Sequence, residues 1–147
     1  MKLKKYIILL FNMLLIITFS ALTLSLSSTS FKAGMDAYVI SGSVADNNYG
    51  TAPYLYVGKY DSGSEIREIR AYIYFPLTSL PTNAIITKAL LRLRLNNKFQ
   101  FSAGEIKNFY IYMVSQSWSE TTVTWNNKPA TDRYVNIFTI KDTTTVP

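Results

Sequence analysis

Four glutamates are the residues of this sequence that could support hydrolytic chemistry: Glu65, Glu68, Glu105 and Glu120. A glycosidase needs two carboxyl groups about 5 to 10 Å apart across a cleft. No spacing here places two of them on one face beside a pocket. Glu65 and Glu68 lie among Arg67 and Arg70, where surface charge pairs are expected. We therefore predict that the protein is not an enzyme.

The composition also removes other catalytic and metal-binding groups. The chain of 147 residues contains no histidine, the commonest general base, and no cysteine, so it can form neither disulfides nor thiolate metal sites. The oxygen donors Asp36, Asp46 and Asn47 lie in or near predicted turns and are of the type that calcium binds. They form no recognised calcium loop. We expect Asp46, Asn47 and Asn48 to make side-chain turns, with a structural calcium as the alternative.

Tyrosine and arginine side chains could bind sugars. Flat aromatic rings pack against the apolar C–H faces of sugars, and arginine can pair with the carboxylate of an acidic sugar. Ten of the 11 tyrosines lie beyond the first 28 residues. The candidates for carbohydrate binding are Tyr72, Tyr74, Arg92, Arg94, Tyr110 and Tyr112. The alternative is that these tyrosines are cross-strand partners or cover the second side of a sheet.

Short extended segments must position these residues. The expected strands are 36–40, 54–57, 69–75, 89–95, 108–114 and 134–140. In 69–75 and 89–95 apolar residues alternate with others, which indicates half-buried strands and places Tyr72, Tyr74, Arg92 and Arg94 on the outer faces. Six to eight short strands separated by turn residues indicate an all-β sandwich.

The stretch 118–130, Trp-Ser-Glu-Thr-Thr-Val-Thr-Trp-Asn-Asn-Lys-Pro-Ala, is the most specific in the chain. Its threonines and Val123 favour a short strand, and Asn126 to Pro129 form a turn. We expect Glu120 to fix the loop by accepting hydrogen bonds from backbone amides. Trp118 and Trp125 flank the apolar strand, which favours core packing over sugar stacking.

This stretch is similar to the signature of the DNRLRE domains, grouped with the family 96 carbohydrate-binding modules. Upstream segments agree with the family in order, among them Asp36-Ala37-Tyr38-Val39, Asn48-Tyr49-Gly50-Thr51, Leu55-Tyr56-Val57-Gly58 and Arg70-Ala71-Tyr72-Ile73-Tyr74-Phe75, followed by Leu80-Pro81 and Ile86-Thr87-Lys88-Ala89-Leu90-Leu91-Arg92-Leu93. The resemblance covers about residues 31–129. It implies a jelly-roll-type antiparallel β-sandwich that binds carbohydrate, with a structural role for the signature residues Trp118, Glu120, Trp125, Asn126 and Pro129.

The family pattern usually continues through further strands after this signature, whereas here only one strand follows it. We expect a domain that is incomplete at its C-terminus because the chain is truncated. The alternative is that another molecule supplies a strand at an open sheet edge.

Residues 1–28 have the pattern of a secretory signal. Three lysines precede a long uncharged apolar stretch that ends in small residues. We expect a cleaved signal helix, with an uncleaved membrane anchor as the alternative, and a domain over residues 29–147 that is secreted or lies on the cell surface. Without Lys2, Lys4 and Lys5, the net charge of +6 falls to +3, which is too small to indicate nucleic acid binding.

Two functions from different classes follow. The first is a secreted, non-catalytic module that binds a polysaccharide, and the arginines favour an anionic one. The second is a structural cell-surface protein that self-associates through its sheet edge.

Overall fold

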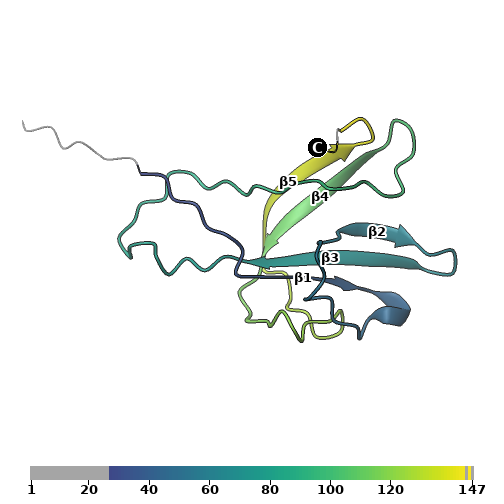
Figure 1. Ribbon diagram of the computed structural model, residues 1–147, viewed down its shortest axis with the longest axis horizontal. Helices are drawn as coiled ribbons and strands as arrows, with labels where there is room; N and C mark the ends of the chain where they lie inside the picture. Colours follow the sequence, from purple (N-terminus) through teal and green to yellow (C-terminus); the bar gives the residue numbers. More distant parts are fainter. Residues whose placement is uncertain (1–26, 145, 147) are drawn as a thin grey trace, which may run out of the picture. The chain divides into compact units, whose positions relative to one another are not determined.

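The structure, a computed structural model, describes residues 27–144 and 146. The described chain is all-β, with five strands and one short 3-10 helix. These elements are β1 (Met35–Ile40), η1 (Gly42–Val44), β2 (Gly58–Asp61), β3 (Ile66–Tyr74), β4 (Ile106–Met113) and β5 (Arg133–Lys141). All of them lie in the compact unit Phe31–Pro147. They form two antiparallel sheets, as expected for a β-sandwich (Figure 1).

The predicted signal segment, residues 1–28, lies outside the described residues except for its last two positions. Among the residues that are described, no helix has the length and apolar character needed to cross a bilayer.

The first sheet has the strand order β1-β3-β2, with β3 in the centre. Ala37 lies opposite Tyr72 in the β1–β3 ladder, and Gly58 lies opposite Ile69 in the β2–β3 ladder. The turn between β2 and β3 contains Gly63 with φ of 83°, a backbone conformation that glycine adopts without steric strain. Asp61 ends β2, and Ser62 to Glu65 connect it to β3.

The second sheet consists of β4 and β5. Phe109 lies opposite Phe138, and the two rings stack with their centroids 5.2 Å apart. A bulge interrupts the register between Ile111 and Tyr112. Because successive side chains of a strand point to opposite faces, Phe109 lies on the half-buried face of β4, and Tyr110 lies on the exposed face.

The core lies on one face of the first sheet, beneath the stretch 118–130. Its buried members are Ala37, Val39, Tyr72 and Val123. The half-buried side chains of Val114, Trp118 and Trp125 pack against this cluster. Both tryptophans thus contact the core, in line with the expectation of core packing.

Three strand predictions were wrong. Residues 54–57 are not a strand, because pairing with β3 begins only at Gly58. The Thr-rich run 121–124 forms turns instead, in which the Thr122 and Val123 amides both donate to the Ser119 carbonyl. In the described chain, residues 89–95 are in no ladder, and their side chains are almost all exposed. An alternating pattern identifies a segment that suits a pleated surface, but a strand also needs a partner.

The face assigned to Tyr72 was also wrong. The alternation in β3 indicated that Tyr72 points outward, yet its side chain is only 6 % exposed and belongs to the core cluster. Its hydroxyl donates to the Pro129 carbonyl over 3.3 Å. Both faces of this strand carry apolar or aromatic residues, so the pattern alone could not show which face the 118–130 stretch covers.

Candidate functional site

Three tyrosines gather on the exposed face of the β4–β5 sheet. Tyr110 and Tyr112 come from β4, and Tyr134 lies near the start of β5. The Tyr134 ring lies 6.5 Å from the Tyr110 ring and 6.0 Å from the Tyr112 ring, centroid to centroid. The three residues are 58 %, 47 % and 51 % exposed. We call Tyr110, Tyr112 and Tyr134 the tyrosine surface.

Ladder geometry explains why these rings meet. Tyr112 lies directly opposite Tyr134, and Tyr110 lies opposite Ile137. Directly opposite side chains share one face of an antiparallel sheet. The next pair on this face is polar, and the Thr139 hydroxyl donates to Asn108 Oδ1 over 2.9 Å. The surface therefore offers aromatic rings beside hydroxyl and amide groups, a combination that suits sugar recognition.

The structure brings together only two of the six predicted binding residues, Tyr110 and Tyr112. Tyr72 lies in the core, and Tyr74 is exposed at the end of β3 in the other sheet. Arg92 and Arg94 are exposed in the unpaired segment between β3 and β4. Neither arginine takes part in any of the three ion pairs of the described chain.

Sequence reasoning missed Tyr134. It recognised a strand over 134–140 but had no means of deciding which strand pairs with it. The pairing of β5 with β4, and the bulge that shifts the register by one residue, place this ring beside the other two. The sequence offered only one indication of this arrangement, namely that both strands are rich in aromatic residues.

The stretch 118–130 is held to the first part of the domain by polar contacts. The Asp36 amide donates to Glu120 Oε1 over 2.8 Å, a contact of the kind expected for Glu120. The Asn48 side chain donates to the carbonyls of Glu120 and Val123 over 2.9 and 2.7 Å. The geometry supports a structural role for this signature.

The second half of this stretch is held in the same way. The Trp125 amide donates to the Ala45 carbonyl, and the Asn126 side chain donates to Asp46 Oδ1 over 2.7 Å. Trp125 has cationic groups near its ring, with Arg70 Cζ at 5.0 Å and Lys128 Nζ at 3.9 Å from the centroid. Burial, together with the charge of Arg70, lowers the pKa of Lys128.

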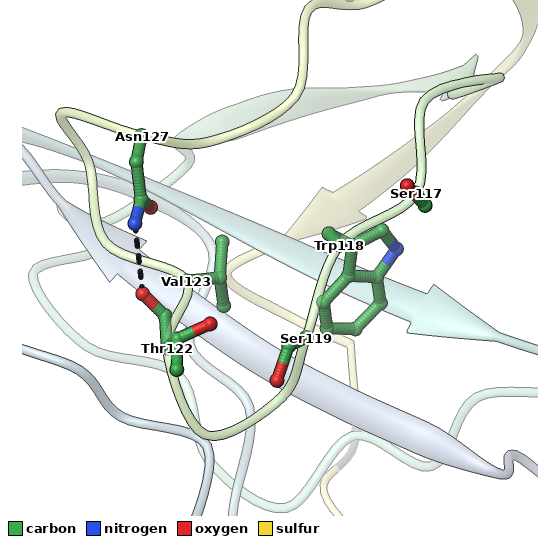
Figure 2. Close-up of a pocket in the computed structure, with 6 residues that line it drawn as sticks. All are labelled: Ser117, Trp118, Ser119, Thr122, Val123 and Asn127. Carbon is green, nitrogen blue, oxygen red and sulfur yellow. Dashed lines mark hydrogen bonds between the residues drawn. The ribbon is translucent and has the colours of Figure 1, made fainter.

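A shallow groove of about 410 Å³ opens in the first part of this stretch and also reaches the preceding Ser117 (Figure 2). Its two sides are the limbs of one loop, residues 117–119 and residues 122–127. The lining residues are Ser117, Trp118, Ser119, Thr122, Val123 and Asn127. The groove combines an indole ring with hydroxyl and amide groups, and none of its side chains is charged.

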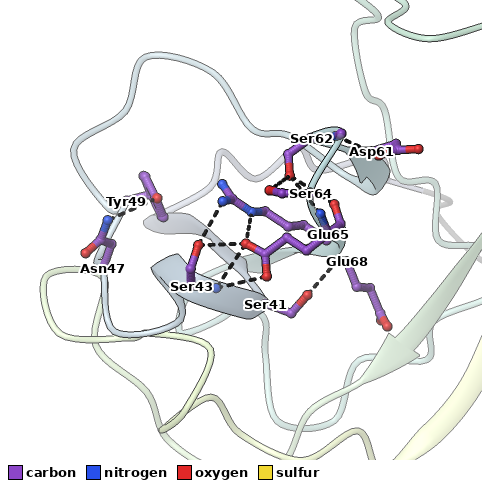
Figure 3. Close-up of polar contacts among 11 residues, drawn as sticks. Ser41, Ser43, Asn47, Tyr49, Asp61, Ser62, Ser64, Glu65 and Glu68 are labelled. Atoms are coloured by element: carbon purple, nitrogen blue, oxygen red, sulfur yellow. Dashed lines mark hydrogen bonds and ion pairs between the residues drawn. The ribbon is translucent and has the colours of Figure 1, made fainter.

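The four glutamates considered for hydrolysis each have a local structural partner. Glu65 accepts hydrogen bonds from the Ser43 amide and hydroxyl and from Arg67 Nε (Figure 3). Glu68 pairs with Arg70 at 2.6 Å. The predicted surface charge pairs are thus confirmed. Glu105 lies 3.5 Å from Lys107 Nζ, and Glu120 binds the Asp36 amide.

The oxygen donors considered for calcium do not converge. Asp46 accepts a hydrogen bond from Asn126, and the Asn47 side chain donates to the Tyr49 hydroxyl over 3.4 Å. Within residues 27–144 and 146, no three acidic, histidine or cysteine side chains come together where they could hold a metal ion.

An all-β fold that presents exposed aromatic rings beside polar groups is typical of sugar-binding modules. The chain matches the model of carbohydrate-binding module family 96 over residues 27–145, and it belongs to that family. The resemblance to the family 96 modules is thereby confirmed, and the protein is a carbohydrate-binding module. A comparison with curated proteins found no match.

Proposed function

We propose that the protein is a secreted, non-catalytic module that binds a polysaccharide through the tyrosine surface. The observation that carries this proposal is the cluster of three exposed rings, whose neighbouring centroids are 6.0 and 6.5 Å apart on one face of β4–β5. Exposed aromatic clusters on soluble domains commonly mark binding sites, because leaving such area in water is unfavourable. In this proposal residues 1–28 are the signal and residues 29–147 form a domain of jelly-roll type.

The charge distribution favours an anionic polysaccharide. The sequence contains no acidic residue between Glu68 and Glu105, whereas Arg92 and Arg94 lie exposed within that interval. A guanidinium group can bind a carboxylate through two parallel hydrogen bonds. The segment that carries these arginines is the part of the chain suited to contact an acidic sugar.

The role as a non-catalytic module is supported by the contacts of the glutamates. A glycosidase acid must be free to reach its substrate, whereas Glu65 and Glu120 bind distant segments of the fold and Glu68 pairs with Arg70. Modules of this kind typically attach to a polymer that another domain or protein modifies. Their common extracellular location agrees with the signal pattern of residues 1–28.

The test is affinity electrophoresis of the protein in gels that contain neutral or acidic polysaccharides. We expect retardation by one polymer class, and a loss of about 5- to 10-fold in affinity for Tyr110→Ala and for Tyr134→Ala, because each removes about 1 kcal/mol of ring contact. Tyr54→Ala is the matched control, since Tyr54 is 55 % exposed but lies outside this sheet. Equal losses in all three variants, or no retardation of the folded protein, would contradict the proposal.

A second candidate function is self-association at the cell surface, which one observation favours. The unpaired segment between β3 and β4 exposes large apolar side chains, including Ile85 at 87 % and Leu90 at 66 %. Such a segment can pair with the strand of another molecule. Two copies paired through this segment would bring Lys88, Arg92 and Arg94 against like charges, which is unfavourable.

Sedimentation velocity over a range of protein concentrations distinguishes this function from polysaccharide binding, because only self-association predicts assemblies that grow with concentration.

A further inference from the structure

We propose that the groove within the stretch 118–130 is a second sugar subsite, distinct from the tyrosine surface, and that it takes a single neutral sugar ring. The inference rests on the proposed function for the class of ligand. The position of the site follows from the geometry of the groove itself.

The size and composition of the groove suit a sugar. Its volume of about 410 Å³ lies within the range of small-molecule sites. Figure 2 shows the Val123 side chain projecting between the two limbs of the loop, with the Trp118 indole beside the limb that carries Ser117 and Ser119. An indole face can pack against the C–H face of a sugar, while the hydroxyls of Ser117 and Thr122 can bond to sugar hydroxyls.

Polar groups of the lining are available for a ligand. Among the lining residues, the Asn127 side chain donates to the Thr122 carbonyl over 2.9 Å (Figure 2), and the Thr122 and Val123 amides donate to the Ser119 carbonyl. The Ser119 hydroxyl lies 3.2 Å from the Thr121 hydroxyl, outside the lining. No bond among the lining residues therefore uses the Ser117 or Thr122 hydroxyl.

The groove is held open by the fold. Val123 at its base is 3 % exposed and belongs to the core cluster, and the Trp118 ring lies 5.9 Å from the buried ring of Tyr72. The Asn48 side chain fixes the loop through the carbonyls of Glu120 and Val123. Because the loop is ordered before a ligand arrives, little conformational entropy is lost on binding.

The absence of charge in the lining determines the class of sugar. None of the six lining side chains is ionisable, so a carboxylate placed there would give up part of its hydration without gaining a cationic partner. A neutral hexose meets no such penalty. The groove thus suits a neutral sugar unit of a polysaccharide, whereas the segment that carries Arg92 and Arg94 suits an acidic unit.

The experiment is an NMR titration of the protein that follows the indole N–H resonance of Trp118, with glucose, galactose and mannose as neutral probes and glucuronate as the acidic probe. We expect a saturable shift with at least one neutral sugar and a response to glucuronate at least about 5-fold weaker. Thr122→Val with Ser117→Ala should weaken the neutral sugar at least about 5-fold, because two hydrogen bonds are lost. Thr131→Val, an exposed threonine outside the groove, should leave it unchanged.

The inference would be overturned if no neutral sugar shifted the Trp118 indole resonance of the folded protein. It would also be overturned if the shift persisted unchanged in the Ser117→Ala/Thr122→Val variant. The outcome is separable from the test of the tyrosine surface. A Tyr110→Ala/Tyr134→Ala variant that no longer binds polymer but keeps the Trp118 response would leave the groove established as an independent subsite. If the wild type binds no polymer yet the Trp118 resonance responds, the proposed function fails while the subsite stands.

Discussion

The backbone amide of Asp36 donates a hydrogen bond to Glu120 Oε1 over 2.8 Å and so joins the start of β1 to a residue 84 positions later in the chain. On the other side of the same glutamate, its carbonyl lies against Gly50 and accepts a hydrogen bond from Asn48. One residue of the 118–130 stretch thus fastens two early segments. This arrangement explains why the stretch has a structural role, and it yields the first two predictions.

Replacing Gly50 by alanine should destabilise the domain by about 3 kcal/mol. A Cβ at this position would overlap the Glu120 carbonyl, and backbone atoms cannot move aside without displacing the loop. The measurement is the free energy of unfolding in urea. Gly63→Ala is the control, because no atom lies within 4 Å of its added Cβ and only its φ of 83° opposes the change, at about 1 kcal/mol. Equal destabilisation in the two variants would show that the contact with Glu120 is not tight.

Replacing Glu120 by alanine should lower the free energy of unfolding by about 2 kcal/mol, because the half-buried Asp36 amide loses its acceptor. Glu120→Gln retains an oxygen at the same place and should lose less than half as much. Thermal unfolding followed by circular dichroism compares the two variants. A glutamine variant as unstable as the alanine variant would mean that the negative charge, and not the hydrogen bond, holds the loop.

The pH dependence of stability should report the contacts of Glu65. Hydrogen bonds from the Ser43 hydroxyl, from Arg67 and from the Ser43 amide hold the pKa of Glu65 below its ordinary value of 4.5. A carboxyl group with a lowered pKa stabilises the fold while it is ionised. This contribution is present above pH 4.5 and is lost as the pH falls toward the lowered pKa.

Glu65→Gln should therefore flatten the acid limb of stability below pH 4.5, measured as the urea midpoint against pH. Asp132→Asn is the control, because it removes an exposed carboxylate that lies outside this cluster. An acid limb that is equally steep in the wild type and in Glu65→Gln would show that these exposed hydrogen bonds contribute no stability.

The sequence predicted the strand segments better than their partners. The expected extended segments matched β1, β3, β4 and β5 to within a few residues, because residue propensity and side-chain periodicity are local properties. Which strands pair, and which faces are covered, depends on contacts between distant segments. For that reason the pattern at 89–95 predicted a strand that the described chain does not form, and Tyr134 could not be placed beside Tyr110 and Tyr112.

The candidate site was predictable only where it depended on a single strand. Tyr110 and Tyr112 lie two apart on one strand, so they share a face wherever that strand lies. Tyr72 obeys the same rule on β3, but the 118–130 stretch covers its face, and alternation carries no information about such a loop. The role of Glu120 was readable because an acid within a turn-rich stretch has few other partners than backbone amides.

The buried position of Tyr72 makes a separate prediction about binding. Tyr72→Phe keeps the ring in the core and removes only the hydroxyl that donates to the Pro129 carbonyl over 3.3 Å. We expect a loss of about 1 kcal/mol in the free energy of unfolding and no change in polysaccharide affinity. Affinity electrophoresis beside Tyr110→Ala tests this. A loss of affinity without a loss of stability would restore Tyr72 as a binding residue.

The salt dependence of binding should identify the contribution of Arg92 and Arg94. If an acidic polymer is the ligand, its charges interact with exposed guanidinium groups through water, where salt screens them over about 10 Å at 0.1 M ionic strength. Affinity should therefore fall as salt is added. Arg92→Gln/Arg94→Gln should reduce the affinity at low salt and make this fall less steep. The contact with the tyrosine surface should remain, because it is largely insensitive to salt.

The matched control for this pair is Lys59→Gln with Lys32→Gln, which removes two positive charges from exposed positions outside the arginine-bearing segment. A general effect of net charge would flatten the salt dependence equally in both double variants, because the net charge changes by the same amount. A local contact would flatten it only in the arginine variant. If neither variant changes the dependence, the ligand of the tyrosine surface is neutral, and the arginines do not contribute to its recognition.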